Sequence, residues 1–224
     1  MNTAAGSRPR YDEWADWYER YITGDAQNFT QRTAEVLSQV LGPGVGPLLD
    51  LACGTGIYAQ TVSALGWTPF GVDLSAGQLR HARSRMPVAV AEASALPVRA
   101  GACAAVTAVM CHTDIDGYAF TCQALSAALR IGGVFAHVGV HPCYIGAFAD
   151  RSNPSEILIT PGYWERERRF DGPWHGVRAR VGARHIPLGE LLDTFIRAGL
   201  TIDRVIEAGD PTPDILAVRC IRTG

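Results

Sequence analysis

The segment 47–57 combines residue types that can bind a nucleoside. An apolar run ends at Asp50, and the chain then turns through Gly54 and Gly56. Neither glycine has a Cβ atom, so the backbone can turn tightly and approach a ligand, and a helix that begins near Ile57 would direct its first N–H groups at that ligand. A second apolar run ends at Asp73, whose carboxylate suits the hydroxyl groups of a ribose. Together the two elements predict a nucleoside cofactor.

Two kinds of cofactor fit this turn. The pattern Gly54-x-Gly56-x-x-Ala59 satisfies the dinucleotide fingerprint, so an NAD(P)-dependent oxidoreductase is one reading. Asp50 favours another, because a carboxylate is a poor neighbour for a pyrophosphate and a good partner for an ammonium group. S-adenosylmethionine carries an ammonium group and no phosphate. Asp50 has a purely structural alternative, which is to cap the turn that follows it.

Three motifs then occur in an order and at spacings that resemble those of class I S-adenosylmethionine-dependent methyltransferases of the small-molecule type. They are residues 49–56, 71–75 and 92–97. The resemblance implies that Asp50 and the loop from Gly54 to Gly56 hold the methionine part of the cofactor and that Asp73 holds the ribose. It also implies that Glu92 and Ala93 meet the adenine edge. Ala52 and Leu74 are expected to contact the same cofactor.

The segment 11–18 is similar to the N-terminal helix with which many members of this family cover the cofactor. Tyr11 and Tyr18 are therefore expected at the cofactor, although packing against the domain is the simpler use of such an aromatic stripe. The resemblance covers about residues 10–140. It departs from the family at residues 102–105, which read Ala-Cys-Ala-Ala where an aromatic residue and an aspartate are usual.

The apolar pattern predicts an α/β fold of the Rossmann-like, doubly wound type. The expected parallel strands are near 47–52, 68–72, 87–91, 105–110 and 133–139, and the expected helices between them are near 57–65, 75–84 and 117–130. Gly132 and Gly133 are expected to end the last of these helices. A helix over 187–199 and two edge strands, 201–206 and 214–221, should follow. The resemblance implies a mostly parallel seven-stranded sheet whose C-terminal edge hairpin is antiparallel.

We expect a single methyltransferase domain over residues 1–224. Its parts are N-terminal lid helices (11–41), a cofactor-binding core (47–141), a substrate-side insertion (142–186) and a C-terminal helix with edge strands (187–224). A chain of this length with 47% hydrophobic residues can bury one core.

Candidate catalytic residues follow the fourth and fifth strands, because ligands of such sheets bind beyond the carboxyl ends of the strands. Methyl transfer needs alignment of the acceptor and a base that takes its proton. His112 and His141 are the predicted bases, and the alternative for each is a histidine that orders its loop. Asp114 is expected to orient His112 or to contact the substrate, with helix capping as its structural alternative. A small-molecule acceptor is predicted, with oxygen ranked before nitrogen as the acceptor atom.

The segment 161–185 mixes aromatic residues with arginines. Tyr163, Trp164, Trp174 and His175 are its candidate substrate residues. Functionally this suits a planar or acidic small molecule, with a guanidinium group for a carboxylate or phosphate. Structurally it suits a pair of solvated extended strands, because residues 178–182 alternate polar and apolar types. An RNA methyltransferase is the third reading.

The overall composition narrows these alternatives. A net charge of −2 disfavours nucleic acid as the default partner, and the absence of lysine excludes lysine Schiff-base chemistry. The six cysteines show no zinc-like spacing, so no metal is expected. No secretory or membrane-spanning segment is apparent, so a cytoplasmic protein is expected. A protein that binds S-adenosylmethionine without transferring methyl also remains open, and the sequence indicates no oligomeric state.

Overall fold

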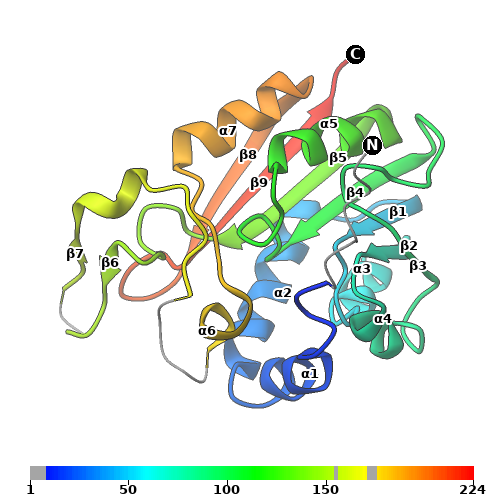
Figure 1. The fold of residues 1–224 in the computed structure, drawn as a ribbon. Coiled ribbons are helices and arrows are strands. Elements are labelled where there is room, and N and C mark those ends of the chain that lie inside the picture. The colour runs from blue at the N-terminus through cyan, green and yellow to red at the C-terminus, as the bar shows by residue number, and fades with distance from the viewer. Residues whose placement is uncertain (1–8, 154–155, 171–175) are drawn as a thin grey trace, which may run out of the picture.

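The structure, a computed structural model, describes residues 9–153, 156–170 and 176–224. Its main sheet has seven strands in the order β3-β2-β1-β4-β5-β9-β8 (Figure 1). In that order the strands are Val88–Val90, Trp67–Asp73, Gly46–Leu51, Cys103–Val109, Leu129–Val140, Ile215–Arg222 and Leu200–Ala208. The first five run parallel, and β9 is antiparallel to both of its neighbours. The predicted Rossmann-like sheet with an antiparallel C-terminal edge is thereby confirmed.

Helices connect the parallel strands, as such connections require. The helices of the main body are α1 (Ala15–Thr23), α2 (Gln27–Leu41), α3 (Ala59–Ala64), α4 (Ala76–Ala82), α5 (Tyr118–Ala128) and α7 (Leu188–Arg197). Between β5 and α7 lie the short strands β6 (Ala149–Asp150) and β7 (Leu158–Ile159), the 3-10 helix η1 (Pro161–Trp164) and α6 (Val177–Val181). Figure 1 shows β6 and β7 projecting away from the main sheet. No described helix has the length and apolar character needed to cross a bilayer.

Both faces of the main sheet are buried. Leu49 and Leu51 belong to the cluster beneath α5 and α7, whereas Leu48 lies in the cluster beneath α2. This period of two is what a pleated strand imposes on its side chains. All seven residues of the central strand β4 are buried, which explains why its sequence reads as a continuous run of small and apolar residues. The two covered faces leave the ends of the strands as the place for a ligand.

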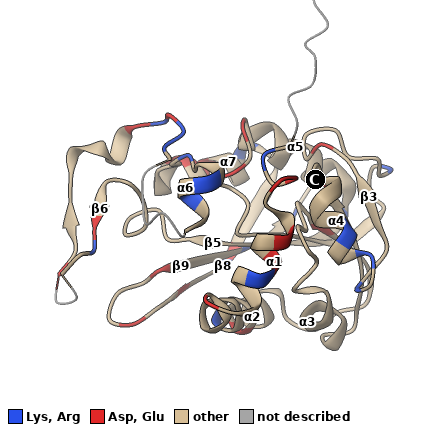
Figure 2. Ribbon diagram, turned by 60° about the horizontal axis from the view of Figure 1, so that its bottom comes forward, with Lys and Arg blue, Asp and Glu red and all other residues tan. Residues whose placement is uncertain are grey.

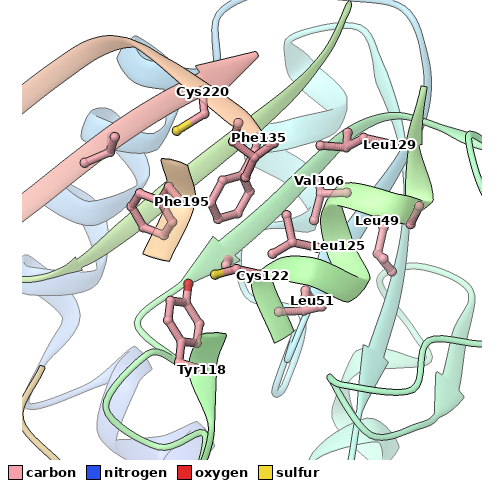
Figure 3. Packing of buried hydrophobic residues seen from close by; sticks show 14 of the residues in the cluster. Leu49, Leu51, Val106, Tyr118, Cys122, Leu125, Leu129, Phe135, Phe195 and Cys220 are labelled. Atoms are coloured by element: carbon pink, nitrogen blue, oxygen red, sulfur yellow. The ribbon is translucent and has the colours of Figure 1, made fainter. Parts of the chain in front are cut away.

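Aromatic rings fill the larger cluster, between the sheet and helices α5 and α7 (Figure 3). The rings of Phe195 and Phe135 meet edge to face with centroids 5.4 Å apart, and Tyr118 lies on the other side of Phe195 at 6.5 Å. Phe195 and Phe135 are fully buried. Helix α7 is therefore held to the sheet chiefly through Phe195 and Leu191, the two buried residues of that helix.

The end of α5 differs from the expectation. The predicted helix extended to residue 130 with Gly132 and Gly133 as its stop, but α5 ends at Ala128 and β5 begins at Leu129. Leu129 is fully buried and pairs with Cys103 of β4, so strand pairing ends the helix. Gly132 and Gly133 lie inside β5, beside a register shift in the pairing with β4.

The expected pair of extended strands near 178–182 is wrong. Residues Val177–Val181 form the one-turn helix α6, and among the described residues of 161–185 only an isolated bridge, between Arg169 and Ala183, has strand character. The Arg180 guanidinium lies 3.9 Å from the ring centroid of Trp17 on α1, which anchors this turn to the N-terminal helix. A contact from a distant part of the chain outweighs a short alternating pattern, which specifies a strand only weakly.

Replacing Phe195 with alanine tests the role of α7. We expect the free energy of unfolding to fall by about 3–5 kcal/mol, because the substitution removes a fully buried ring and leaves a cavity. Ile196→Ala, next to it and 58% exposed, is the matched control and should change stability by less than about 0.5 kcal/mol. Urea denaturation of both variants measures the difference, and equal losses would show that α7 is not held through Phe195.

Candidate functional site

The turn after β1 is tightly wound. Ala52, Gly54 and Gly56 all have positive φ angles, of 52°, 55° and 74°. A Cβ atom on Gly56 would lie 3.1 Å from the Cβ of Ala82 on α4, so the turn packs closely under that helix. The glycines thus serve both the turn and its packing, while the backbone at Gly54 stays open to a ligand.

Asp73 fixes this turn from the end of β2. Its Oδ2 accepts a hydrogen bond from the Gly54 N–H at 2.8 Å, and its Oδ1 accepts one from the Ser75 N–H, also at 2.8 Å. Burial raises the pKa of the Asp73 carboxyl, and these backbone bonds oppose that shift. Each carboxylate oxygen has a second lone pair, so Asp73 retains the capacity to accept hydroxyl donors from a ligand.

A cavity of about 430 Å³ lies at the carboxyl ends of β1, β2 and β4. Nine of the ten predicted cofactor residues line it, and the tenth, Gly56, does not. The nine are Tyr11, Tyr18, Asp50, Ala52, Gly54, Asp73, Leu74, Glu92 and Ala93. The predicted substrate residue Asp114 lines it as well. Sequence motifs separated by more than a hundred positions therefore meet at one cavity.

Asp50 is the most deeply buried acid of this cavity, with 4% of its surface exposed. Thr107 of β4 donates its hydroxyl to Asp50 Oδ1 at 2.9 Å. Burial raises the pKa of Asp50 to about 7, which the bond from Thr107 opposes. A buried carboxyl of this kind is stabilised in its charged form by a cation, and the described protein residues supply no ion pair to it.

Residues 10–12 cross the cavity from one wall to the other, and we call them the strap. Tyr11 donates its hydroxyl to Asp114 Oδ2 at 3.1 Å. Asp12 Oδ1 accepts hydrogen bonds from the Ser75 hydroxyl at 2.6 Å and from the Gly77 N–H at 3.0 Å, at the start of α4. The Tyr11 and Tyr18 rings meet edge to face at 5.4 Å. The N-terminal segment is thus a wall of the cavity.

Asp114 faces the cavity opposite the glycine turn. Burial raises the pKa of its carboxyl to about 6, while the Tyr11 hydroxyl and the charges of Arg168 and Arg10 oppose that shift. A carboxyl with such a pKa is ionised near neutral pH and can take up a proton from a stronger acid beside it. Asp114 is therefore a candidate proton acceptor as well as a substrate contact.

Neither predicted histidine base lines the cavity. His112 is buried against His137, with ring centroids 5.0 Å apart, and burial lowers the pKa of His112 to about 4. His141 is buried as well, with Nε2 2.7 Å from Glu207 Oε1 and with Nδ1 accepting the Cys143 N–H at 3.1 Å. Both nitrogens of His141 are thus engaged in holding a loop.

The predicted substrate residues Tyr163 and Trp164 do not line this cavity either. Tyr163 accepts the Leu188 N–H through its hydroxyl at 3.1 Å and packs against Phe148 and His185. The ring of Trp164 stands in solvent, 71% exposed. Trp174 and His175 lie outside the described residues. No group of three or more potential metal-binding side chains occurs within the described ranges.

Sequence reasoning missed Asp12, Arg10 and Gln78, all of which belong to this region. Gln78 lies in the first turn of α4, is 2% exposed, lines the cavity, and its amide nitrogen and oxygen have no partner in the described structure. The sequence feature that could have identified Gln78 is its position three residues after Ser75, the residue that caps α4. A polar residue so close to a strand end points toward the ligand rather than toward solvent.

Comparison with known proteins matches residues 48–133 to the methyltransferase domain family. Two curated relatives are sugar-nucleotide enzymes of Streptomyces. The dTDP-3-amino-3,4,6-trideoxy-alpha-D-glucopyranose N,N-dimethyltransferase of Streptomyces venezuelae is 26% identical over 161 residues, which cover 70% of this chain and 60% of that protein. The dTDP-3-amino-3,6-dideoxy-alpha-D-glucopyranose N,N-dimethyltransferase of Streptomyces fradiae is 33% identical over 92 residues, which cover 40% of this chain and 36% of that protein. The matches thus span less than two thirds of either relative.

A solved structure has the same fold. An S-adenosylmethionine-dependent methyltransferase from Mesorhizobium loti superposes with a TM-score of 0.71 at 22% identity, covering 84% of this chain and 96% of that one. The family match falls on the strands and the glycine turn that build the cavity. Over residues 48–133 the chain is therefore similar to the methyltransferase domain family, and its fold is that of S-adenosylmethionine-dependent methyltransferases.

Proposed function

We propose that this protein transfers a methyl group from S-adenosylmethionine to the amino group of a small molecule. The observation that carries the proposal is a single cavity with the glycine turn and Asp73 on one side and the carboxylate of Asp114 on the other. The match of residues 48–133 to the methyltransferase domain family favours S-adenosylmethionine over the nicotinamide cofactor that the glycine turn alone also allows. Relatives that methylate amino sugars support a nitrogen acceptor.

The residues of the cavity fit this cofactor. Its volume, about 430 Å³, lies within the usual range for small-molecule sites. Asp50 would hold the ammonium group of the methionine part, and Asp73 would accept the ribose hydroxyls. The Gln78 amide, buried without a protein partner, would supply a further donor and acceptor at the same wall. When bound, S-adenosylmethionine supplies an electrophilic methyl carbon, so the acceptor's lone pair forms the new bond as the carbon–sulfur bond breaks and its electrons pass to sulfur.

The protein's part is to hold the acceptor and to take its proton. Arg10 and Tyr11 of the strap form part of the cavity wall together with Tyr18, and such a wall reduces the water around the reacting atoms. A carboxylate at Asp114 would bind the ammonium form of the acceptor by charge and take the proton that this nitrogen must lose before its lone pair can attack. The Tyr11 hydroxyl holds that carboxylate in place through its hydrogen bond to Oδ2.

The chemistry of Asp114 favours nitrogen over oxygen, which reverses the order expected from the sequence. A carboxyl with a pKa of about 6 is a far weaker base than an alkoxide, so it gives little help to an alcohol acceptor. An amine needs a base only to remove one proton from its ammonium form, after which it attacks through its own lone pair. The Asp114 carboxylate, paired with that ammonium group, is placed to accept the proton.

Asp73→Ala tests the cofactor site. We expect affinity for S-adenosylhomocysteine to fall about 5- to 150-fold, since the substitution removes about 1–3 kcal/mol of hydrogen bonding to the ribose and frees the Gly54 turn. Asp193→Ala, on the solvent side of α7, is the control and should bind normally. Calorimetric titration with S-adenosylhomocysteine, with NADH alongside, provides the measurement. Unchanged affinity of a folded Asp73 variant would remove this residue from the site.

The raised pKa of Asp50 predicts a pH dependence of cofactor binding. Below about pH 7 the carboxyl of the free protein is protonated, so binding of an ammonium group must first expel that proton. Affinity for S-adenosylhomocysteine should thus weaken as the pH falls from 8.5 to 5.5, by up to about tenfold per pH unit. Asp50→Asn should bind weakly with a flatter profile. A profile that keeps its full slope in this variant would assign the dependence to another acid.

Replacing Asp114 with asparagine tests whether the base is Asp114 rather than His112 or His141. This variant keeps the shape of the side chain and loses the ability to accept a proton, so turnover should fall about 10²- to 10⁴-fold while cofactor affinity changes little. Wild-type turnover should rise with pH through about 6, as Asp114 ionises. Release of S-adenosylhomocysteine with a panel of amino-sugar nucleotides measures both effects.

His112→Asn and His141→Gln are the comparison variants for the same assay. Neither ring reaches the cavity, so we expect their turnover to stay within a few-fold of wild type when the proteins are folded. Loss of turnover in either histidine variant, with activity kept in Asp114→Asn, would return the base to that histidine. Binding of the cofactor without turnover on any amine or alcohol would support a binding protein instead.

A further inference from the structure

Three arginines converge on one carboxylate beside the cavity. Asp116 lies 2.6 Å from Nε of Arg184, 3.0 Å from a terminal nitrogen of Arg168 and 3.6 Å from one of Arg10. The three come from separate parts of the chain: the strap, the loop after η1 and the residues after α6. Three guanidinium groups thus face Asp116, and the charges of Arg10 and Arg168 also act on the carboxyl of Asp114, so that one positive charge is left in excess.

This arginine cluster, Arg10, Arg168 and Arg184 around Asp116, adjoins the acceptor side of the cavity. Arg10 and Asp116 are themselves lining residues, as is Asp114. Arg10 and Arg168 also donate hydrogen bonds to the backbone oxygen of Asp114, whose side chain faces the cavity. A group bound by the cluster would therefore lie next to the position where the acceptor nitrogen must sit.

The cluster is both accessible and firmly built. The side chain of Arg168 is 12% exposed and is further fixed by its hydrogen bond to the Gly182 oxygen at 3.2 Å. The side chains of Arg10 and Arg184 are 40% and 41% exposed, and that of Asp116 is 56% exposed. Asp116 can thus swing into solvent, which would leave a fixed guanidinium and two movable ones open to another anion.

We propose that this cluster binds a phosphate or diphosphate group of the acceptor, a step that rests on the proposed function above. Guanidinium groups match the geometry and charge of phosphate oxygens and bind them through paired N–H donors. A dianionic group meets three arginines better than the single carboxylate of Asp116 does, so it displaces that side chain. The acceptor class is thereby narrowed to phosphorylated amines, with the amino group directed at Asp114.

The charge pattern favours a small anion over a nucleic acid. Figure 2 shows basic and acidic residues interspersed along the described part of the ribbon, and the chain has a net charge of −2, whereas nucleic-acid-binding domains are usually strongly basic. Three arginines around one aspartate fit one phosphorylated group. Tighter binding of a longer polyanion would contradict this proposal.

The experiment is a calorimetric titration of the full chain, saturated with S-adenosylhomocysteine, with inorganic pyrophosphate at low salt. Malonate and a short single-stranded RNA serve as the competing probes. Arg10→Gln and Arg184→Gln, both at partly exposed positions, should each weaken pyrophosphate binding about tenfold, because each removes one charge-assisted contact. Arg197→Gln, on the surface of α7, is the matched control and should bind as wild type does. Asp116→Asn should bind pyrophosphate several-fold more tightly, because it removes the competing carboxylate.

The possible results of this titration distinguish the phosphate subsite from the proposed methyltransferase function. Pyrophosphate binding that responds to these variants as stated supports the phosphate subsite. Absent binding, or binding that is equal in all variants, overturns the subsite while leaving the methyltransferase proposal intact. Tighter binding of malonate than of pyrophosphate would show that the cluster binds a carboxylate rather than a phosphate. Tighter binding of RNA than of either small anion would overturn the proposal that the acceptor is a small molecule. Failure of S-adenosylhomocysteine itself to bind would overturn the proposed function rather than the subsite alone.

Discussion

The carboxylate of Asp73 is the interaction on which the site depends, because it joins the ends of two neighbouring strands. One oxygen holds the Gly54 N–H of the turn after β1, and the other holds the Ser75 N–H at the start of α4. Ser75 then caps α4 by accepting the Gln78 N–H and donates its own hydroxyl to Asp12 of the strap. A connected set of hydrogen bonds therefore runs from the cofactor turn to the covering segment.

The electrostatics of the cavity follow from the burial of the carboxyl groups that line it. Asp50, Asp73 and Asp114 all have pKa values raised chiefly by burial, and the charge of Asp73 raises those of the other two further. Three carboxyls this close disfavour one another's ionisation unless a cation enters. A cofactor with an ammonium and a sulfonium group relieves this repulsion. The acidic lining around Asp50 and Asp73 thus favours a cationic group at the cofactor end of the cavity, as Asp50 alone had indicated.

The sequence allowed most of the sheet and the cofactor wall to be predicted, for a physical reason. Residues at the end of a buried strand are fixed by the period of the strand and by the rule that parallel strands end at one edge. Asp50 and Asp73 stand at such ends, and the structure places both on the cavity.

The histidines show where that logic stops. His112 also follows a strand end, but Met110 has a positive φ of 54°, so the chain turns before reaching it and the ring enters the core beside His137. His141 follows β5, where the antiparallel strands β9 and β8 bring Glu207 against it. Strand periodicity gives the edge at which a residue lies and does not give the direction of its side chain beyond the last paired residue. The resemblance placed Tyr11 at the cofactor, but the roles of Arg10 and Asp12 were beyond prediction, since their partners lie about sixty to a hundred positions away. Three consecutive residues reaching both walls make the N-terminus part of the site, so the geometry of the acceptor side depends on the same segment that closes the cofactor side.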